Sequence, residues 1–72
     1  MSYDLTKGEN RVRVNFNVGG SKDVDKIKIK TAELINLIDS LPNKDGEMER
    51  LKSLAMTTYE EAAMWAVKAA TA

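Results

Sequence analysis

The sequence predicts an all-α protein: an antiparallel helical hairpin that follows a short extended N-terminal segment and assembles into a homo-oligomer. Two segments, residues 24–41 and 47–70, carry apolar residues every three or four positions, which is typical of helices with one buried face. The only proline, Pro42, lies between them. A chain of 72 residues buries little core by itself, so we expect one domain, residues 11–72, that needs partner subunits.

Residues 1–10 show no hydrophobic periodicity, and we expect them to form a flexible N-terminus. From residue 11 to residue 18 the chain then alternates between polar and apolar side chains. This period of two predicts an extended segment with one buried face. The residues expected on that face are Val12, Val14, Phe16 and Val18. Two adjacent glycines, Gly19 and Gly20, allow the chain to turn there.

The first long helix has a cap at its start and a clear stop. Ser21 or Asp23 can cap it, and Asp23 and Asp25 suit the positive end of its dipole. Its predicted inner residues are Val24, Ile27, Thr31, Leu34, Ile35, Ile38 and Leu41. Pro42 ends this helix, and the short connection over residues 42–46 makes the next helix an antiparallel neighbour.

The second helix contains no glycine or proline from residue 47 to residue 70. Its predicted inner residues are Met48, Leu51, Ala55, Thr58, Ala62, Trp65 and Ala69. Tyr59, Met64 and Trp65 are expected to close the core of the hairpin. At about 1.5 Å per residue, this helix outreaches the first by roughly 10 Å. Ile29 and Leu37 lie off the first helix's stripe, and we interpret them as part of a subunit interface.

Composition excludes several kinds of chemistry. The chain has no cysteine and no histidine, which removes disulfides, Cys or His zinc sites, Cys nucleophiles and Ser-His triads. The paired carboxylates fit solvated helix surface, so we expect neither an enzyme nor a bound metal or cofactor. No apolar run is long enough for a signal sequence or a bilayer span, so we expect an intracellular protein with no membrane partner.

Charge is balanced over the whole chain but not along it. The net charge is zero, which argues against a general nucleic-acid coat. Residues 1–32 hold seven basic and four acidic side chains, whereas residues 33–72 hold four basic and seven acidic ones. An anionic ligand should therefore contact the N-terminal half. The alternative is that its lysines form only a solvated helix face.

Several groups near the glycine turn suit a small cyclic anion that contains bases and phosphates. An aromatic ring can stack on a base, an amide can bind a base edge, and backbone N–H groups at a helix start can bind phosphate. Lysines of the following helix could meet the same phosphates. These candidates are Phe16, Asn17, Gly19, Gly20, Ser21, Lys26, Lys28 and Lys30. The alternatives are that Phe16 is a core residue and the turn is purely structural.

A rival interpretation comes from the same pattern. One alternating segment followed by two helices is the order of ribbon-helix-helix repressors, in which outward ribbon side chains enter the major groove of DNA. Here those side chains would be Arg11, Arg13, Asn15 and Asn17. The helices are longer than a compact dimeric repressor needs, and the acidic second helix would repel DNA. A third possibility is a protein-interaction hairpin without a nucleotide ligand.

The C-terminal stretch Tyr59-Glu60-Glu61-Ala62-Ala63-Met64-Trp65-Ala66-Val67-Lys68-Ala69 resembles a family signature, Glu-Glu-Ala-x-Met-Trp-Ala. Two further matches are Asn15-Phe16-Asn17 before a glycine turn, and Ile27-Lys28 leading into residues 31–35. Over residues 14–72 the chain resembles the phage anti-CBASS protein that sponges cyclic oligonucleotides. The same hairpin domain is shared with a phage antagonist of Thoeris immunity.

This resemblance implies a compact hexamer of kinked hairpins in the host cytoplasm. It also implies that cyclic di- and trinucleotide signals are bound without cleavage, so that the immune effector stays off. An aromatic residue followed by Asn stacks on the bases in the family. Phe16 and Asn17 match, although a Tyr is expected where this chain has Phe16. The phosphate contact is one of Lys26, Lys28 and Lys30, and Thr31 would line a separate cyclic trinucleotide site between subunits.

Overall fold

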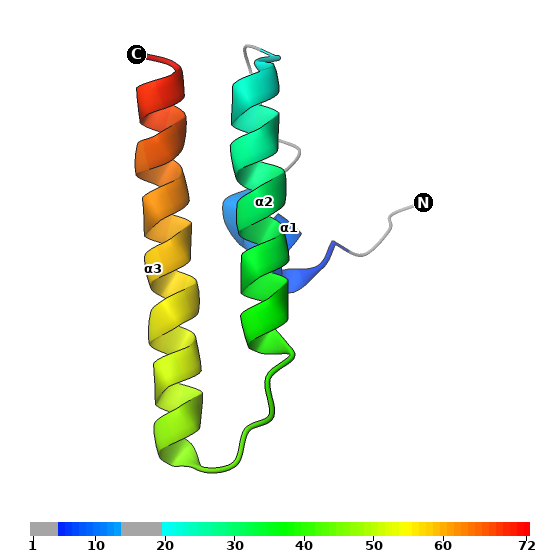
Figure 1. The fold of residues 1–72 in the computed structure, drawn as a ribbon, viewed down its shortest axis with the longest axis vertical. Coiled ribbons are helices and arrows are strands. Elements are labelled where there is room, and N and C mark those ends of the chain that lie inside the picture. Colours follow the sequence, from blue (N-terminus) through cyan, green and yellow to red (C-terminus); the bar gives the residue numbers. More distant parts are fainter. Residues whose placement is uncertain (1–4, 14–19) are drawn as a thin grey trace.

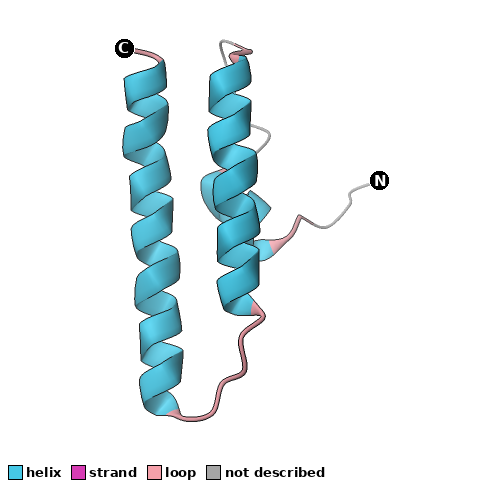
Figure 2. Cartoon of the chain, viewed as in Figure 1, coloured by secondary structure: helices cyan, strands magenta, loops and turns pink. Residues whose placement is uncertain are grey.

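The computed structural model describes residues 5–13 and 20–72, which form three helices and no strand (Figures 1 and 2). Helix α1 spans Lys7–Val12, α2 spans Lys22–Asp39 and α3 spans Gly46–Ala70. In Figure 1, α2 and α3 lie side by side and run in opposite directions. The short α1 packs mainly on α2. The prediction of an all-α antiparallel hairpin is therefore confirmed.

Side-chain caps mark the start of both long helices. Ser21 is one of the two residues predicted to cap α2, and its hydroxyl accepts a hydrogen bond from the Val24 N–H at 3.3 Å. The Asp45 carboxylate accepts one from the Met48 N–H at 2.8 Å at the start of α3. These bonds satisfy amides that have no partner within the helix. The two helices consequently begin and end close to the positions that the sequence predicts.

The prediction for the N-terminal part is wrong for residues 7–12, which form a helix instead of a flexible and then extended chain. A capping box begins α1, because the Thr6 hydroxyl accepts from the Glu9 N–H and the Glu9 carboxylate accepts from the Thr6 N–H. Val12 is buried as predicted, although on a helix. Local capping and packing on α2 outweigh the short alternating pattern. Residues 14–18 lie outside the described part of the chain.

Helix α1 is fastened to α2 by a close backbone contact and a bridging amide. A Cβ atom on Gly8 would lie 2.1 Å from the Ala32 carbonyl oxygen, so only glycine permits this approach. The Gly8 N–H donates to the Asn36 side-chain oxygen at 2.8 Å, and the Asn36 amide donates to the Thr6 hydroxyl at 3.0 Å. Thus Asn36 holds the first turn of α1 in a fixed position on α2.

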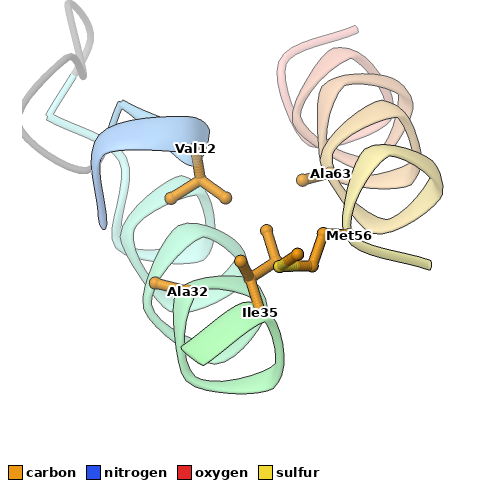
Figure 3. Packing of buried hydrophobic residues seen from close by; sticks show 5 residues of the cluster. All are labelled: Val12, Ala32, Ile35, Met56 and Ala63. Atoms are coloured by element: carbon orange, nitrogen blue, oxygen red, sulfur yellow. The ribbon is translucent and has the colours of Figure 1, made fainter. Parts of the chain in front are cut away.

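A small core fills the junction of the three helices. Figure 3 shows its five residues, with Ile35, Met56 and Ala63 meeting between α2 and α3: Val12, Ala32, Ile35, Met56 and Ala63. Ile35 is the largest fully buried side chain in the described part of the chain. Ile27 and Ile38 pack against this cluster at its edge. Ile35 thus lies inside as predicted, whereas the predicted inner residues Leu34 and Leu41 are exposed.

The predicted inner face of α3 is wrong. Leu51, Thr58 and Trp65 are exposed, and the residues buried against the rest of the chain are Lys52, Met56 and Ala63. The predicted closing core residues Tyr59, Met64 and Trp65 are exposed too. The reason is that α3 carries apolar side chains on two sides. Helical periodicity finds such a stripe, but it cannot tell which of two stripes contacts α2.

Two lysines are buried and act as caps for neighbouring helices. The Lys52 ammonium is on a side chain only 8% exposed and donates to the carbonyl oxygens of Asp39 at 3.1 Å and Leu41 at 2.6 Å. The Lys28 ammonium donates to the Arg13 carbonyl oxygen at 3.0 Å, just after α1. Carbonyls at helix C-termini lack partners within the helix and attract positive charge. Each lysine therefore joins one helix to the end of another.

We expect the substitution Lys52→Met to lower the free energy of unfolding by about 2 kcal/mol, since hydrogen bonds to a charged group contribute about 1.5–3 kcal/mol and the Lys52 ammonium makes two of them, both partly buried. Methionine keeps most of the side-chain volume, so the loss reports on the hydrogen bonds. Urea denaturation followed by circular dichroism measures it. Lys44→Met, in the exposed connection, is the matched control and should unfold as the wild type does. Equal stability of the two variants would contradict the capping role.

Candidate ligand site

The structure places some of the predicted site residues and leaves others untested. Phe16, Asn17 and Gly19 lie outside the described residues, so their roles stay predictions. Gly20 is exposed and has a φ of 64°, a left-handed conformation that glycine adopts without strain, so a glycine turn does precede α2. Ser21 caps α2. Thr31 is half-buried, and its hydroxyl donates to the Ile27 carbonyl oxygen at 2.7 Å.

The three candidate lysines of α2 do not form one cluster. Lys26 and Lys30 are exposed and lie four residues apart, on the same face of the helix. Lys28 is midway between them in sequence and projects from the other side, where it is only 6% exposed and bound to the Arg13 carbonyl oxygen. Any ligand that contacts Lys28 must therefore approach from the side of α1.

A cavity of about 510 Å³ lies on that side, between the end of α1 and the C-terminal half of α3. Positive charge comes from α1 and α2, apolar surface from α1 and α3, and two carboxylates from α3. The lining residues are Arg11, Val12, Arg13, Lys28, Thr57, Glu60, Glu61, Ala63, Met64 and Val67. The cavity thus combines three cationic side chains with an apolar floor, in a volume that suits a small organic ligand.

The two arginines are set in place by the helix that the sequence pattern did not reveal. Arg13 follows α1 in a left-handed conformation with a φ of 55°, which is uncommon for a residue with a Cβ. The guanidinium of Arg11 pairs with the Glu60 carboxylate at 3.3 Å, across the cavity from α1 to α3. Guanidinium groups bind phosphate in a two-pronged geometry, so an anionic ligand would compete with Glu60 for Arg11.

The alternating sequence pattern predicts Arg11 and Arg13 only as outward side chains of a DNA-reading ribbon. Arg11 is helical and Arg13 ends the helix, so the ribbon interpretation is wrong where the structure describes it; Asn15 and Asn17 lie outside the described residues. The pattern Thr6-x-x-Glu9 was the available signal, because a capping box predicts a helix start. No signal in the sequence pairs Arg11 with Glu60.

The fold and the cavity define a small helical hairpin domain with a candidate ligand site lined by cationic, acidic and apolar side chains. Residues 7–71 match the model of the Acb2/Tad1 hairpin domain family. The chain therefore belongs to this family of phage anti-defence hairpins, as its C-terminal signature predicts. No curated protein and no solved structure gave a match. Among the described residues, no helix is both long and apolar enough to cross a membrane.

Proposed function

We propose that this protein sequesters cyclic di- and trinucleotide immune signals in the host cytoplasm without cleaving them, and so keeps CBASS effectors inactive. The family match over residues 7–71 carries the proposal, because it links the chain to phage anti-defence hairpins with the role of a sponge. A sponge needs affinity and copy number, not a catalytic group. The absence of histidine and cysteine from the chain is compatible with such a role.

The chemistry of the cavity supports an anionic ligand with flat apolar parts. Arg11, Arg13 and Lys28 can meet phosphate oxygens, while Val12 and Met64 offer apolar surface to a base. The predicted stacking of a base on Phe16 would add about 1–3 kcal/mol. We propose further that copies of the chain assemble into a homo-oligomer, a hexamer by family resemblance, with Thr31 at a site between subunits for cyclic trinucleotides.

Isothermal titration calorimetry with a panel of cyclic di- and trinucleotides tests the function. The wild-type protein should bind at least one of them tightly, with a fixed number of ligands per oligomer. After the complex is denatured, chromatography and mass spectrometry should recover the ligand intact. Absence of binding across the panel would refute sequestration, and recovery of a linear or hydrolysed product would refute the non-enzymatic role.

Phe16→Ala should weaken cyclic dinucleotide binding at least tenfold, because it removes stacking worth about 1–3 kcal/mol per base. The comparison is made by calorimetry on oligomers of unchanged mass. Phe16→Tyr is the matched control, since it keeps the ring and restores the hydroxyl expected in the family; it should bind at least as tightly as the wild type. Loss of the oligomer in Phe16→Ala would instead identify Phe16 as a core residue.

Glu60→Gln should tighten binding of the same cyclic dinucleotide several-fold. The substitution removes the carboxylate that pairs with Arg11 at 3.3 Å, and the freed guanidinium becomes available to a phosphate. The affinity should also fall more steeply with added salt, as one more phosphate contact is made. Glu33→Gln, on an exposed part of α2, is the control. Weaker binding in Glu60→Gln would mean that the Arg11–Glu60 pair supports the site instead of competing with the ligand.

A further inference from the structure

Helix α3 presents a second apolar face that no part of the described chain covers. Leu51 and Leu54 are each 51% exposed and Trp65 is 55% exposed, with Thr58 and Ala62 exposed between them. Trp65 comes nine residues after the buried Met56, which in a helix of 3.6 residues per turn is the opposite side. Exposed apolar residues that share one helix face mark an interaction surface more strongly than scattered ones.

The middle of this face is hollow. A shallow depression of about 520 Å³ is lined by Leu54, Ala55, Thr58, Tyr59 and Ala62. Its floor consists of small side chains, which allow another helix to approach α3 closely. Larger side chains stand at its edges and farther along the face. The surface is therefore shaped for an elongated apolar partner such as a helix, which packs its side chains into the spaces between those of its neighbour.

The pattern of this face is symmetric about the middle of α3. Thr58 is the central residue of Gly46–Ala70, and Leu51 and Trp65 each lie seven residues from it. If two copies of α3 cross antiparallel at Thr58, Leu51 of each copy meets Trp65 of the other, and small side chains meet at the crossing. A parallel pairing would set Trp65 against Trp65 and leave Leu51 against Leu51, with poorer matching of size.

Charge favours the same direction. Glu47 lies nine residues before Met56, on the same side of α3 as Trp65, and Lys68 lies near the other end, with its ammonium 5.3 Å from the centre of the Trp65 ring. An antiparallel pair brings Glu47 of one copy toward Lys68 of the other. It also sets the positive end of each helix dipole beside the negative end of its partner. A parallel pair would place like charges together at both ends.

We propose that α3 pairs antiparallel with α3 of a second copy of this chain, centred on Thr58. This pairing would form one interface of the homo-oligomer proposed above. Its geometry is argued from α3 alone, and only its biological purpose rests on the proposed function. The pairing leaves the cavity beside α1 open, because Glu60, Ala63 and Val67 of the cavity lie on the opposite side of α3 from Leu51, Thr58 and Trp65.

Three variants and one control variant test the pairing by multi-angle light scattering and circular dichroism. Leu51→Glu and Trp65→Arg should each reduce the mass of the oligomer at least twofold while the helix content is retained. The double variant should recover the mass, because an antiparallel pair sets the two new charges against each other. Ser53→Glu, a new charge on the same helix outside this face, should leave the mass unchanged. A double variant that is still dissociated would overturn the antiparallel pairing, and single variants with the wild-type mass would overturn the interface.

Cross-linking provides a measurement that does not depend on how well the charged variants fold. Since the chain has no cysteine, Thr58→Cys introduces one thiol per copy at the proposed crossing. Oxidised glutathione should convert this variant to a disulfide-linked dimer on a non-reducing gel, and Ser53→Cys should stay monomeric on the gel. Equal cross-linking of both variants, or none, would overturn the proposal. Cross-linking of Thr58→Cys, together with a wild-type protein that binds no cyclic nucleotide, would refute the proposed function and leave the pairing of α3 standing.

Discussion

Ile35→Ala should lower the free energy of unfolding by about 2–5 kcal/mol, the range for removing a large aliphatic side chain from a packed core. Ile35 is fully buried and belongs to the core cluster with Met56 and the small residues Ala32 and Ala63 (Figure 3). For a protein of this size, such a loss is a large part of the total stability. Urea denaturation monitored by circular dichroism at constant protein concentration measures it.

A graded control accompanies this substitution. Ile35→Val removes one methylene group and should cost about 0.5–1.5 kcal/mol. The two variants together separate the effect of lost volume from any general sensitivity of α2. A loss below about 1 kcal/mol for Ile35→Ala would mean that the core described by Val12, Ile35 and Met56 is not the one that holds the hairpin together.

Gly8→Ala should lower the free energy of unfolding by about 3 kcal/mol, at the upper end of the usual cost of overpacking. The new methyl carbon would lie 2.1 Å from the Ala32 carbonyl oxygen, and a backbone atom in a helix cannot move aside as a side chain can. The first turn of α1 must therefore lift from α2 and lose the bond from the Gly8 N–H to Asn36. Ligand affinity should fall as well, since Arg11 is on the same short helix.

Gly46→Ala is the matched control for Gly8→Ala. Gly46 is the first residue of α3, and a Cβ there would meet nothing within 4 Å. Alanine should leave the stability unchanged or raise it slightly, because glycine is the poorer helix former. Thermal unfolding of both variants at the same concentration makes the comparison. If both glycines tolerate alanine equally, the close approach of α1 to α2 is not required for the fold.

The long helices could be predicted because each carries its own start, stop and apolar repeat. Ser21 caps α2, Pro42 prevents its continuation, and the short connection forces α3 to return alongside. These are local features, and they do not depend on the rest of the fold. Helix α1 differs, because six residues form a stable helix only when a cap and a neighbour support it. Its support comes from Asn36 on α2, which no local pattern reveals.

The sequence predicts only part of the candidate site, because local patterns do not show which residues distant in sequence come together. The excess of positive charge in the N-terminal half led to Lys28, which does line the cavity. The other residues of the lining depend on side-chain direction. Lys26 and Lys30 are exposed and do not line the cavity, whereas α1 places Arg11 and Arg13 in its lining. Helical periodicity predicts the stripe through Leu51, Thr58 and Trp65, but it does not indicate that this stripe faces away from α2.

The Lys52 ammonium helps to hold α2 and α3 together at the end of the hairpin where the chain turns. It bonds two carbonyls at the end of α2 from within α3, so the two helices are joined directly there. The exposed residues 42–45 connect them without having to hold them together. This stretch should accept inserted residues, a fluorescent label or a purification tag with little effect on folding. None of its residues lines the cavity, which makes it a suitable point for attaching the protein to a surface or a reporter.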